Sequence, residues 1–436
     1  MNKSFILFTA FLFVLINNLA AQGDSAAKAD YFKENYIRYE DHIYKEGIKT
    51  VLLHRQGFEL SEPLLILGSP EKLLLSFDEL DAQVQRYHYT FIHCSSDWKP
   101  TDINSRKVME GYEDDYIQDY RTSNNTLQAY VHYELAFPNE NIQLKLSGNY
   151  IILVYADEDK ENPLLTARFS IVEQKMTIKA EIRRANSMDD MAFEQKVDFS
   201  LLARGINLID PYRNLEVIVR QNKRWDNAIT NLKPMMVKGD ELDYHHDFGN
   251  VFNGGNEFRY FDSKSIKYNS ERVSRIDHGE HLYEFFVNPD LKRNTKVYIT
   301  EEDINGRYLI KTVDARDPAV DGDYVIVHFS VPYSPPFIDG SLYLMGGLTY
   351  WQFSNTNKMV YNFNTKSYDL SLLLKQGYYN YQYFFLGNGR LSGDETRIEG
   401  SHFEAENEYD IFVYYKDPAA EYQRLVGWQV VASRKK

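Results

Sequence analysis

The feature that most restricts the fold of this chain is an aromatic run near its C-terminal end, from Gly377 to Phe385. Side chains of an extended strand alternate between two faces, so the tyrosines at 379, 381 and 383 lie on the same face. The intervening Asn380 and Gln382 take the opposite face. The run therefore predicts a β-strand with one aromatic face and one mostly hydrated face.

Similar period-two runs fill the rest of the chain, and no helical pattern of any length interrupts them. Leu370, Leu372 and Leu374 alternate just before the aromatic run, and the segment 375–377 is expected to turn between the two strands. A chain of 436 residues is too long for one sandwich core. We therefore predict an all-β fold of tandem immunoglobulin-like or early-set β-sandwich domains.

Three domains are expected to follow an N-terminal leader. Lys3, the apolar run from Phe5 to Ile16 and the small residues before position 22 predict a signal peptide over residues 1–21. The alternative is a membrane anchor, but the apolar run is too short to cross a hydrocarbon core of ~30 Å. A polar lead is expected over residues 22–35. The prolines at 332, 335 and 336 indicate a stiff linker, and the predicted domains are residues 36–174, 175–331 and 337–433.

The net charge and the absence of catalytic motifs indicate a binding or structural protein. The net charge of −14 offers no basic excess to neutralise phosphates, so we expect no nucleic-acid partner. The pair His245 and His246, with acids at 243 and 247, matches no closed zinc pattern. No catalytic motif or phosphate-binding glycine loop is present. We therefore expect a protein that is not an enzyme, without catalytic residues, metal or cofactor.

Two segments, 95–125 and 245–261, combine aromatic residues with acidic or flexible neighbours and are candidates for contact with a partner. The paired glycines of the second segment let the backbone turn sharply or approach a partner closely. The alternative is that this segment is only a structural loop and that the aromatic rings pack inward. The candidate contact residues are Tyr112, Tyr116, Phe252, Asn253, Gly254, Gly255, Asn256 and Phe258.

The C-terminal unit resembles the glycogen-binding-type early-set sandwich. Its glycine pair at 346–347, Trp351, the aromatic run and the segment 407–409 match the order of that family. The family binds sugar on a platform that needs a second aromatic residue just after the aromatic strand. This chain has Gly387-Asn388-Gly389-Arg390-Leu391 there, so Trp351 is at most a vestige of such a platform.

A longer resemblance, from about Tyr36 to Val431, is to the Plug family of the type IX secretion system of Gram-negative bacteria. Its matching features are the ordered set of three sandwiches and four local runs. These runs are Trp98-Lys99-Pro100, Ser147-Gly148-Asn149-Tyr150, Gly254-Gly255-Asn256-Glu257-Phe258-Arg259 and Gly377-Tyr378-Tyr379-Asn380-Tyr381.

The resemblance implies a soluble periplasmic protein that associates with the outer membrane through its partner without spanning the membrane itself. That partner is a large outer-membrane β-barrel translocon, whose periplasmic opening the family closes when no cargo is engaged. The resemblance to this family nominates no catalytic residues. The alternative is a carbohydrate-binding protein of the cell envelope.

Overall fold

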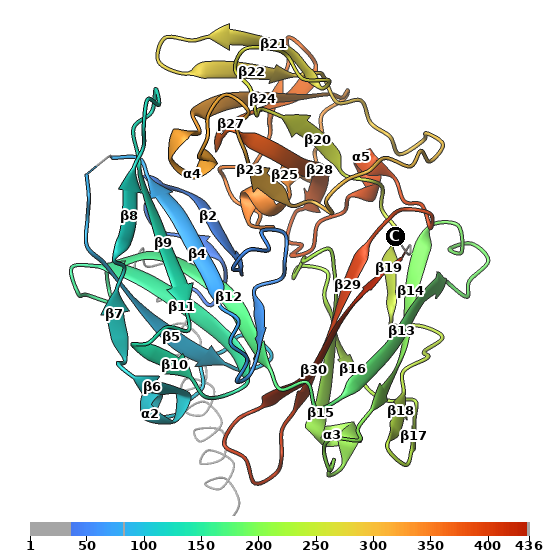
Figure 1. Cartoon of the computed structure of the whole chain (residues 1–436). Coiled ribbons are helices and arrows are strands. Elements are labelled where there is room, and N and C mark those ends of the chain that lie inside the picture. Colours follow the sequence, from blue (N-terminus) through green and yellow to red (C-terminus); the bar gives the residue numbers. More distant parts are fainter. Residues whose placement is uncertain (1–35, 82, 434–436) are drawn as a thin grey trace, which may run out of the picture.

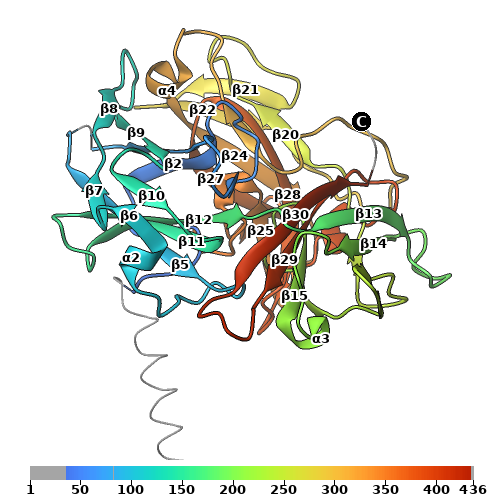
Figure 2. The same ribbon diagram turned by 60° about the horizontal axis from the view of Figure 1, so that its bottom comes forward.

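Three β-sandwiches make up the structure, which is a computed structural model describing residues 36–81 and 83–433. Figure 1 shows the first sandwich at the left, the second at the right and the third above both, and Figure 2 shows the same arrangement from another side. The predicted signal peptide and polar lead lie outside the described residues. The all-β prediction is confirmed, because every helix described is a single short turn. These helices are α2 (Ser105–Val108), α3 (Pro211–Asn214), α4 (Pro318–Asp321), α5 (Thr396–Glu399) and the 3-10 turn η1 (Gly347–Thr349).

The first sandwich packs two mainly antiparallel sheets face to face. One sheet has the order β1-β12-β11-β5-β7, with β3 added parallel to β12. Its strands are β1 (His42–Ile43), β3 (Leu64–Ile66), β5 (Tyr87–Cys94), β7 (Asp114–Tyr116), β11 (Gly148–Ala156) and β12 (Pro163–Val172). The other sheet has the order β2-β4-β9-β8. Its strands are β2 (Ile48–Arg55), β4 (Leu73–Glu79), β8 (Asp119–Thr122) and β9 (Val131–Phe137), and a separate pair joins β6 (Met109–Gly111) to β10 (Ile142–Leu144).

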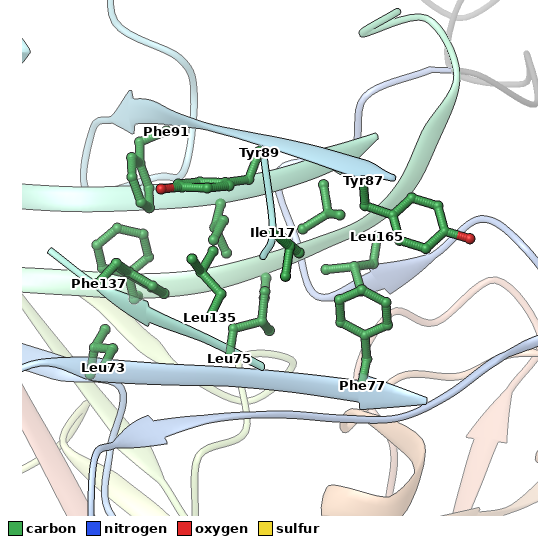
Figure 3. Close-up of a cluster of buried hydrophobic side chains, with 14 of the residues drawn as sticks. Leu73, Leu75, Phe77, Tyr87, Tyr89, Phe91, Ile117, Leu135, Phe137 and Leu165 are labelled. Carbon is green, nitrogen blue, oxygen red and sulfur yellow. The ribbon is translucent and has the colours of Figure 1, made fainter. Parts of the chain in front are cut away.

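Alternation of side chains along these strands builds the core of the first sandwich. Leu73, Leu75 and Phe77 point inward from β4, and Tyr87 and its neighbours at 89 and 91 face them from β5 (Figure 3). All of these side chains are buried. Aromatic rings on both sheets fill the space between them.

The second sandwich takes its strands from two distant parts of the sequence. Its first sheet has the order β13-β14-β18-β17, with β19 also paired to β14. These strands are β13 (Thr177–Arg184), β14 (Glu194–Leu202), β17 (Met236–Lys238), β18 (Glu241–Asp243) and β19 (Val251–Asn253). Its second sheet has the order β16-β15-β29-β30. These strands are β15 (Leu215–Gln221), β16 (Ile229–Leu232), β29 (Glu408–Tyr415) and β30 (Arg424–Ala432).

The third sandwich is inserted between β19 and β29. One of its layers is built on β28, which pairs with β20, β23 and β25. These strands are β20 (Arg259–Asp262), β23 (Tyr308–Ile310), β25 (Gly340–Met345) and β28 (Gly377–Gly387). The other layer has the order β21-β22-β24-β27-β26. Its strands are β21 (Val273–His278), β22 (Tyr283–Val287), β24 (Tyr324–Pro332), β26 (Val360–Asn362) and β27 (Ser367–Lys375).

The predicted division between the second and third domains, at 331 and 337, does not match this strand pairing. β15 pairs with β29 along its whole length, with Val217 opposite Val413. The apolar side chains of β15 therefore share one core with Tyr409 and Ile411, far along the sequence. The proline cluster lies inside the third sandwich, where Pro332 is opposite Ser367, so it is no linker between domains. The resemblance of residues 337–433 to a separate glycogen-binding-type unit is not confirmed.

Two expectations for the aromatic run are also corrected. β27 and β28 do not form a hairpin, because the segment 375–377 carries the chain from one sheet of the third sandwich to the other. The aromatic face of β28 is buried as predicted, but its opposite face is not hydrated: Asn380 is 0% exposed and Gln382 is 3% exposed. Gln382 Nε2 donates to the carbonyl oxygen of Asn256 at 2.6 Å, so hydrogen bonds to neighbouring loops replace water on that face.

Truncation tests the inserted topology. A chain that ends at residue 334 lacks β29 and β30, so β15 keeps only β16 as a neighbour and its apolar side chains lose part of their core. Because exposing a core face on this scale removes the main stabilising term, we expect the second sandwich of this truncated chain to be unfolded or aggregated. Size-exclusion chromatography and circular dichroism measure this.

The matched control keeps β29 and β30 and replaces residues 256–405 by a short glycine–serine linker. The linker can be short because the two ends that it connects lie close together: Asn407 Nδ2 is 2.7 Å from the carbonyl oxygen of Gly254. We expect the control to unfold cooperatively. A chain ending at 334 that folds as well as the control would contradict the topology.

Candidate functional site

Two of the predicted contact residues lie on the surface of the first sandwich. Tyr112 is 65% exposed and Tyr116 is 36% exposed, both in the segment that connects the edges of the two sheets. Tyr116 lies opposite His88 on β5, and the Arg86 guanidinium stacks 4.1 Å from the centre of its ring. This segment contains the short elements α2, β6, β7 and β8. Tyr116 is therefore held on a short strand at a sheet edge, and Tyr112 lies in the connection between β6 and β7.

Phe252 and Phe258 are buried, with 5% and 2% of their surface exposed. The Phe252 ring packs against Tyr409 in the core of the second sandwich, at 5.2 Å between ring centres. The Phe258 ring meets Trp351 edge to face at 5.8 Å. Burial removes both rings from any surface that a partner reaches, which corrects the expectation that they are anchors.

The segment 253–256 is a crossing point between the second and third sandwiches. A Cβ atom on Gly254 would lie 2.1 Å from the carbonyl oxygen of His402, so only glycine lets the two backbones pass this closely. Gly255 adopts a φ of +64°, and Asn256 Nδ2 donates to the carbonyl oxygen of Glu399 at 2.8 Å. Asn253 is exposed but donates to Glu395 Oε1 at 3.2 Å. Of the two alternatives left open by the sequence, these contacts favour the structural loop.

Trp351 does not form an open platform for a sugar. Its ring covers Gly306 so closely that a Cβ there would lie 2.3 Å from Trp351 Cη2, and its edge contacts Phe258. Stacking on a sugar requires a free ring face, so this packing counts against the carbohydrate alternative.

The three sandwiches meet around a cavity of about 170 Å³ lined by three tryptophans, Trp98, Trp225 and Trp351. Trp98 and Trp225 meet edge to face at 5.3 Å. The Arg168 guanidinium lies 4.4 Å from the Trp98 ring and 5.4 Å from the Trp225 ring. Because these rings and the cation come from different sandwiches, they join the first sandwich to the second.

A buried group of ion pairs lies at the same junction. Arg220 of β15 donates to Glu62 Oε1 of the first sandwich at 2.7 Å and to Asp410 Oδ2 of β29 at 2.8 Å. Lys223 Nζ lies 3.4 Å from Glu62 Oε2. Burial by itself raises the pKa of Glu62, but the charges of Arg220 and Lys223 outweigh burial and lower the pKa to about 2. Burial lowers the pKa of Lys223 to about 8.

A second group of buried charges joins the first sandwich to the third. Lys375 Nζ of β27 donates to Asp78 Oδ2 of β4 at 2.7 Å, and their side chains are 1% and 0% exposed. The Tyr324 hydroxyl donates to the same oxygen at 2.7 Å, and His132 Nδ1 lies 2.6 Å from Asp78 Oδ1. The Tyr130 ring lies 4.1 Å from Lys375 Nζ. Burial lowers the pKa of Lys375, whereas hydrogen bonds to Asp78 and Glu134 raise the pKa of His132 against the effect of burial.

These junction residues were missed at the level of sequence, although a weak signal was present. Asp78 and Arg220 stand next to strongly apolar strand residues, at Phe77 and Val219. A charge in such a position needs a partner if it is buried, but the sequence does not identify that partner.

No group of three or more His, Cys, Asp or Glu side chains within residues 36–81 and 83–433 is arranged to hold a metal ion. The two histidines considered above have separate partners: His245 Nδ1 pairs with Asp243, and His246 Nε2 lies 2.9 Å from the carbonyl oxygen of Lys233. Within the same described ranges, no helix is both long and apolar enough to cross a membrane.

Comparison with known proteins gives two results. Residues 48–173 match the family described as "Type 9 secretion system plug protein 1st domain", and they correspond to the first sandwich from β2 to the end of β12. The chain is also similar to a hypothetical protein from Parabacteroides merdae ATCC 43184, known from a crystal structure at 2.30 Å resolution. The two are 35% identical with a TM-score of 0.88, and the alignment covers 91% of this chain and 100% of that chain. None of the curated proteins matches the chain.

The Glu62 carboxylate makes stability depend on pH. Its pKa falls from an ordinary value of 4.5 to about 2, so its contribution is complete above pH 4.5 and is lost as the pH falls toward 2. A shift of this size corresponds to about 3 kcal/mol. We expect Glu62→Gln to lose about 3 kcal/mol of the free energy of unfolding at neutral pH, and the difference from wild type to shrink at acidic pH. Urea denaturation at several pH values measures it.

Glu59→Gln is the matched control, because Glu59 is an exposed carboxylate in the same connection. We expect the control to stay within about 0.5 kcal/mol of wild type. A Glu62→Gln variant with the same stability as the control at every pH would contradict the assignment.

Asp78→Asn tests the junction between the first and third sandwiches. The change leaves the Lys375 ammonium buried without an anion, so we expect a loss of about 3–5 kcal/mol in the free energy of unfolding. Adding Lys375→Met removes the stranded charge and should restore part of that loss. The control Asp339→Asn breaks an exposed pair with Arg397 and should cost less than about 1 kcal/mol. Equal losses for Asp78→Asn and Asp339→Asn would contradict the conclusion that the buried pair of Asp78 and Lys375 stabilises this junction.

Proposed function

This chain belongs to the same family as the Parabacteroides merdae protein and carries the first domain of the type 9 secretion system plug protein, and on that premise we propose that it occludes the outer-membrane translocon of that system. In this proposal it covers the periplasmic opening of the barrel when no cargo is engaged. The match of residues 48–173 to the plug domain is the observation that carries the proposal.

The junctions between the sandwiches support a mechanical role. A body that closes a wide pore must resist deformation, and deformation here would separate buried charges from their partners. Separating Asp78 from Lys375, or Glu62 from Arg220, leaves a charge in an apolar environment at high cost. The three sandwiches therefore act as one block. Such a block closes an opening by its shape alone, so the proposed role requires no chemical step.

The segment 109–122 is our proposed contact with the translocon. It presents Tyr112 and Tyr116 together with exposed carboxylates at Glu113, Asp114 and Asp119. Tyrosine contributes a large apolar ring with a polar end, and the surrounding carboxylates keep the surface hydrated between binding events. This composition is typical of a contact that forms and releases, and it matches a translocon rim that carries basic or polar groups.

The proposed location is the periplasm. The expected signal peptide would export the chain, and contact with the barrel would hold it at the outer membrane. Within residues 36–81 and 83–433 the structure has no helix suited to crossing a membrane.

Loss of the two tyrosines should weaken the proposed contact. We expect Tyr112→Ala/Tyr116→Ala to reduce co-purification of the translocon barrel with the tagged protein by about tenfold, because exposed aromatic anchors contribute strongly to interfaces. A deletion strain complemented with this variant should admit small dyes and large antibiotics more readily than one complemented with wild type. Affinity purification from detergent-solubilised envelopes and dye uptake measure the two effects.

Tyr268→Ala serves as the control, because Tyr268 is a similarly exposed tyrosine, at 60%, on the third sandwich. We expect it to behave as wild type in both assays. Failure of any large barrel to co-purify with the wild-type protein, together with unchanged permeability in the deletion strain, would refute the plug function. A double variant equal to the control would refute the contact surface alone.

A further inference from the structure

A basic loop with exposed apolar side chains connects β22 to β23 in the third sandwich. Residues 291–299 contain Lys292, Arg293 and Lys296 and no carboxylate, in a chain whose net charge is −14. The acids resume only at Glu301. The segment 296–300 belongs to no sheet and lies outside the regular pairing of the sandwich.

The loop covers a pocket of about 360 Å³ with a cationic lining. Four basic side chains line it, from Arg259, Arg272, Arg293 and Lys296, against Asp290 and Glu301. Lys296 is exposed and makes no ion pair within the described residues. Arg272 Nε is buried and has no hydrogen-bond partner there. The pocket therefore has unused donors for an anion.

The carboxylate at the base of this pocket is already satisfied. Asp290 accepts from Arg259 at 3.0 Å and from the hydroxyls of Tyr381 and Tyr383 at 2.7 and 2.8 Å, and it also pairs with Arg272. Buried Glu399 in turn accepts from Arg259 Nε at 3.0 Å and Arg293 Nε at 2.9 Å. These contacts hold the arginines in place, so an incoming anion meets an ordered cationic wall.

Two apolar side chains that also line this pocket are largely exposed to solvent. Val297 is 88% exposed and Ile299 is 70% exposed. The residue between them, Tyr298, is turned inward, where its hydroxyl donates to Glu257 and its ring contacts His402. Because side chains of an extended segment alternate, anchoring Tyr298 inside forces both neighbours toward solvent. Leu291, 57% exposed, adds a third apolar group to the same connection.

We propose that this loop binds the surface of a bilayer containing anionic phospholipid. A lipid phosphate would enter the pocket against Arg272 and Lys296, while Val297 and Ile299 enter the boundary between headgroups and acyl chains. Cations beside exposed aliphatic side chains are the combination that holds peripheral proteins at such a surface. Free phosphate would make use of the cations only, whereas a lipid uses both features. The loop would place the protein beside a membrane-embedded partner, but the inference is independent of the translocon contact.

Vesicle co-sedimentation with the purified mature chain tests the proposal. We expect binding to phosphatidylethanolamine–phosphatidylglycerol vesicles that weakens at high salt, and little binding to phosphatidylcholine vesicles. Val297→Asp/Ile299→Asp should weaken binding by about tenfold. Lys296→Gln should weaken it by about fivefold, as expected for one cation near an anionic surface.

The control is Ile338→Asp/Leu391→Asp, because these aliphatic side chains are 93% and 91% exposed elsewhere on the third sandwich. We expect it to bind as wild type, and thermal unfolding checks that every variant remains folded. Equal binding to neutral vesicles, or unchanged binding of the Val297/Ile299 variant, would overturn the proposal. Stabilisation by inorganic phosphate without vesicle binding would overturn the proposal in favour of a site for a free anion. Binding to polyglutamate that is unchanged in the Val297/Ile299 variant would overturn it in favour of a site for an acidic protein.

Discussion

The arrangement of this protein depends on charges buried between its sandwiches. Asp78 and Lys375 come from the first and third sandwiches, and Glu62 and Arg220 from the first and second. Removing such groups from water has a high cost, and the partner on the neighbouring sandwich offsets it together with His132 beside Asp78 and Asp410 beside Arg220. The interfaces therefore favour one relative orientation of the sandwiches. An apolar contact of similar size would restrict their orientation less strictly.

The inserted topology strengthens this constraint. The chain leaves the second sandwich after β19, completes the third, and returns through β29 and β30. The second sandwich thus holds both ends of the third. At the crossing point, Gly254 lets two backbones approach more closely than any side chain would permit. Covalent connection and buried charge act together to join the three domains.

This construction suits a component that works by its shape. Trp351, the one aromatic residue that resembled a vestige of a sugar platform, is instead packed against Gly306 and Phe258. The aromatic and aliphatic side chains that remain accessible lie at sheet edges and in loops. Tyr112 and Val297 are two of them, and both project from connections between strands. Separate surfaces of one rigid body are thereby available for separate partners.

The sequence by itself determined the all-β class and the buried aromatic face of β28, because period-two alternation records which side chains leave water. It also named Tyr112 and Tyr116 as candidate contact residues, but it left open whether their rings face solvent or pack inward. The tertiary structure alone decided which strands pair, as when β29 joins β15 across an inserted domain, because alternation carries no information about the neighbouring strand. It also decided that Phe252, Phe258, Asn380 and Gln382 are buried. Their burial depends on a second surface from a distant part of the chain, and only folding brings the two surfaces together.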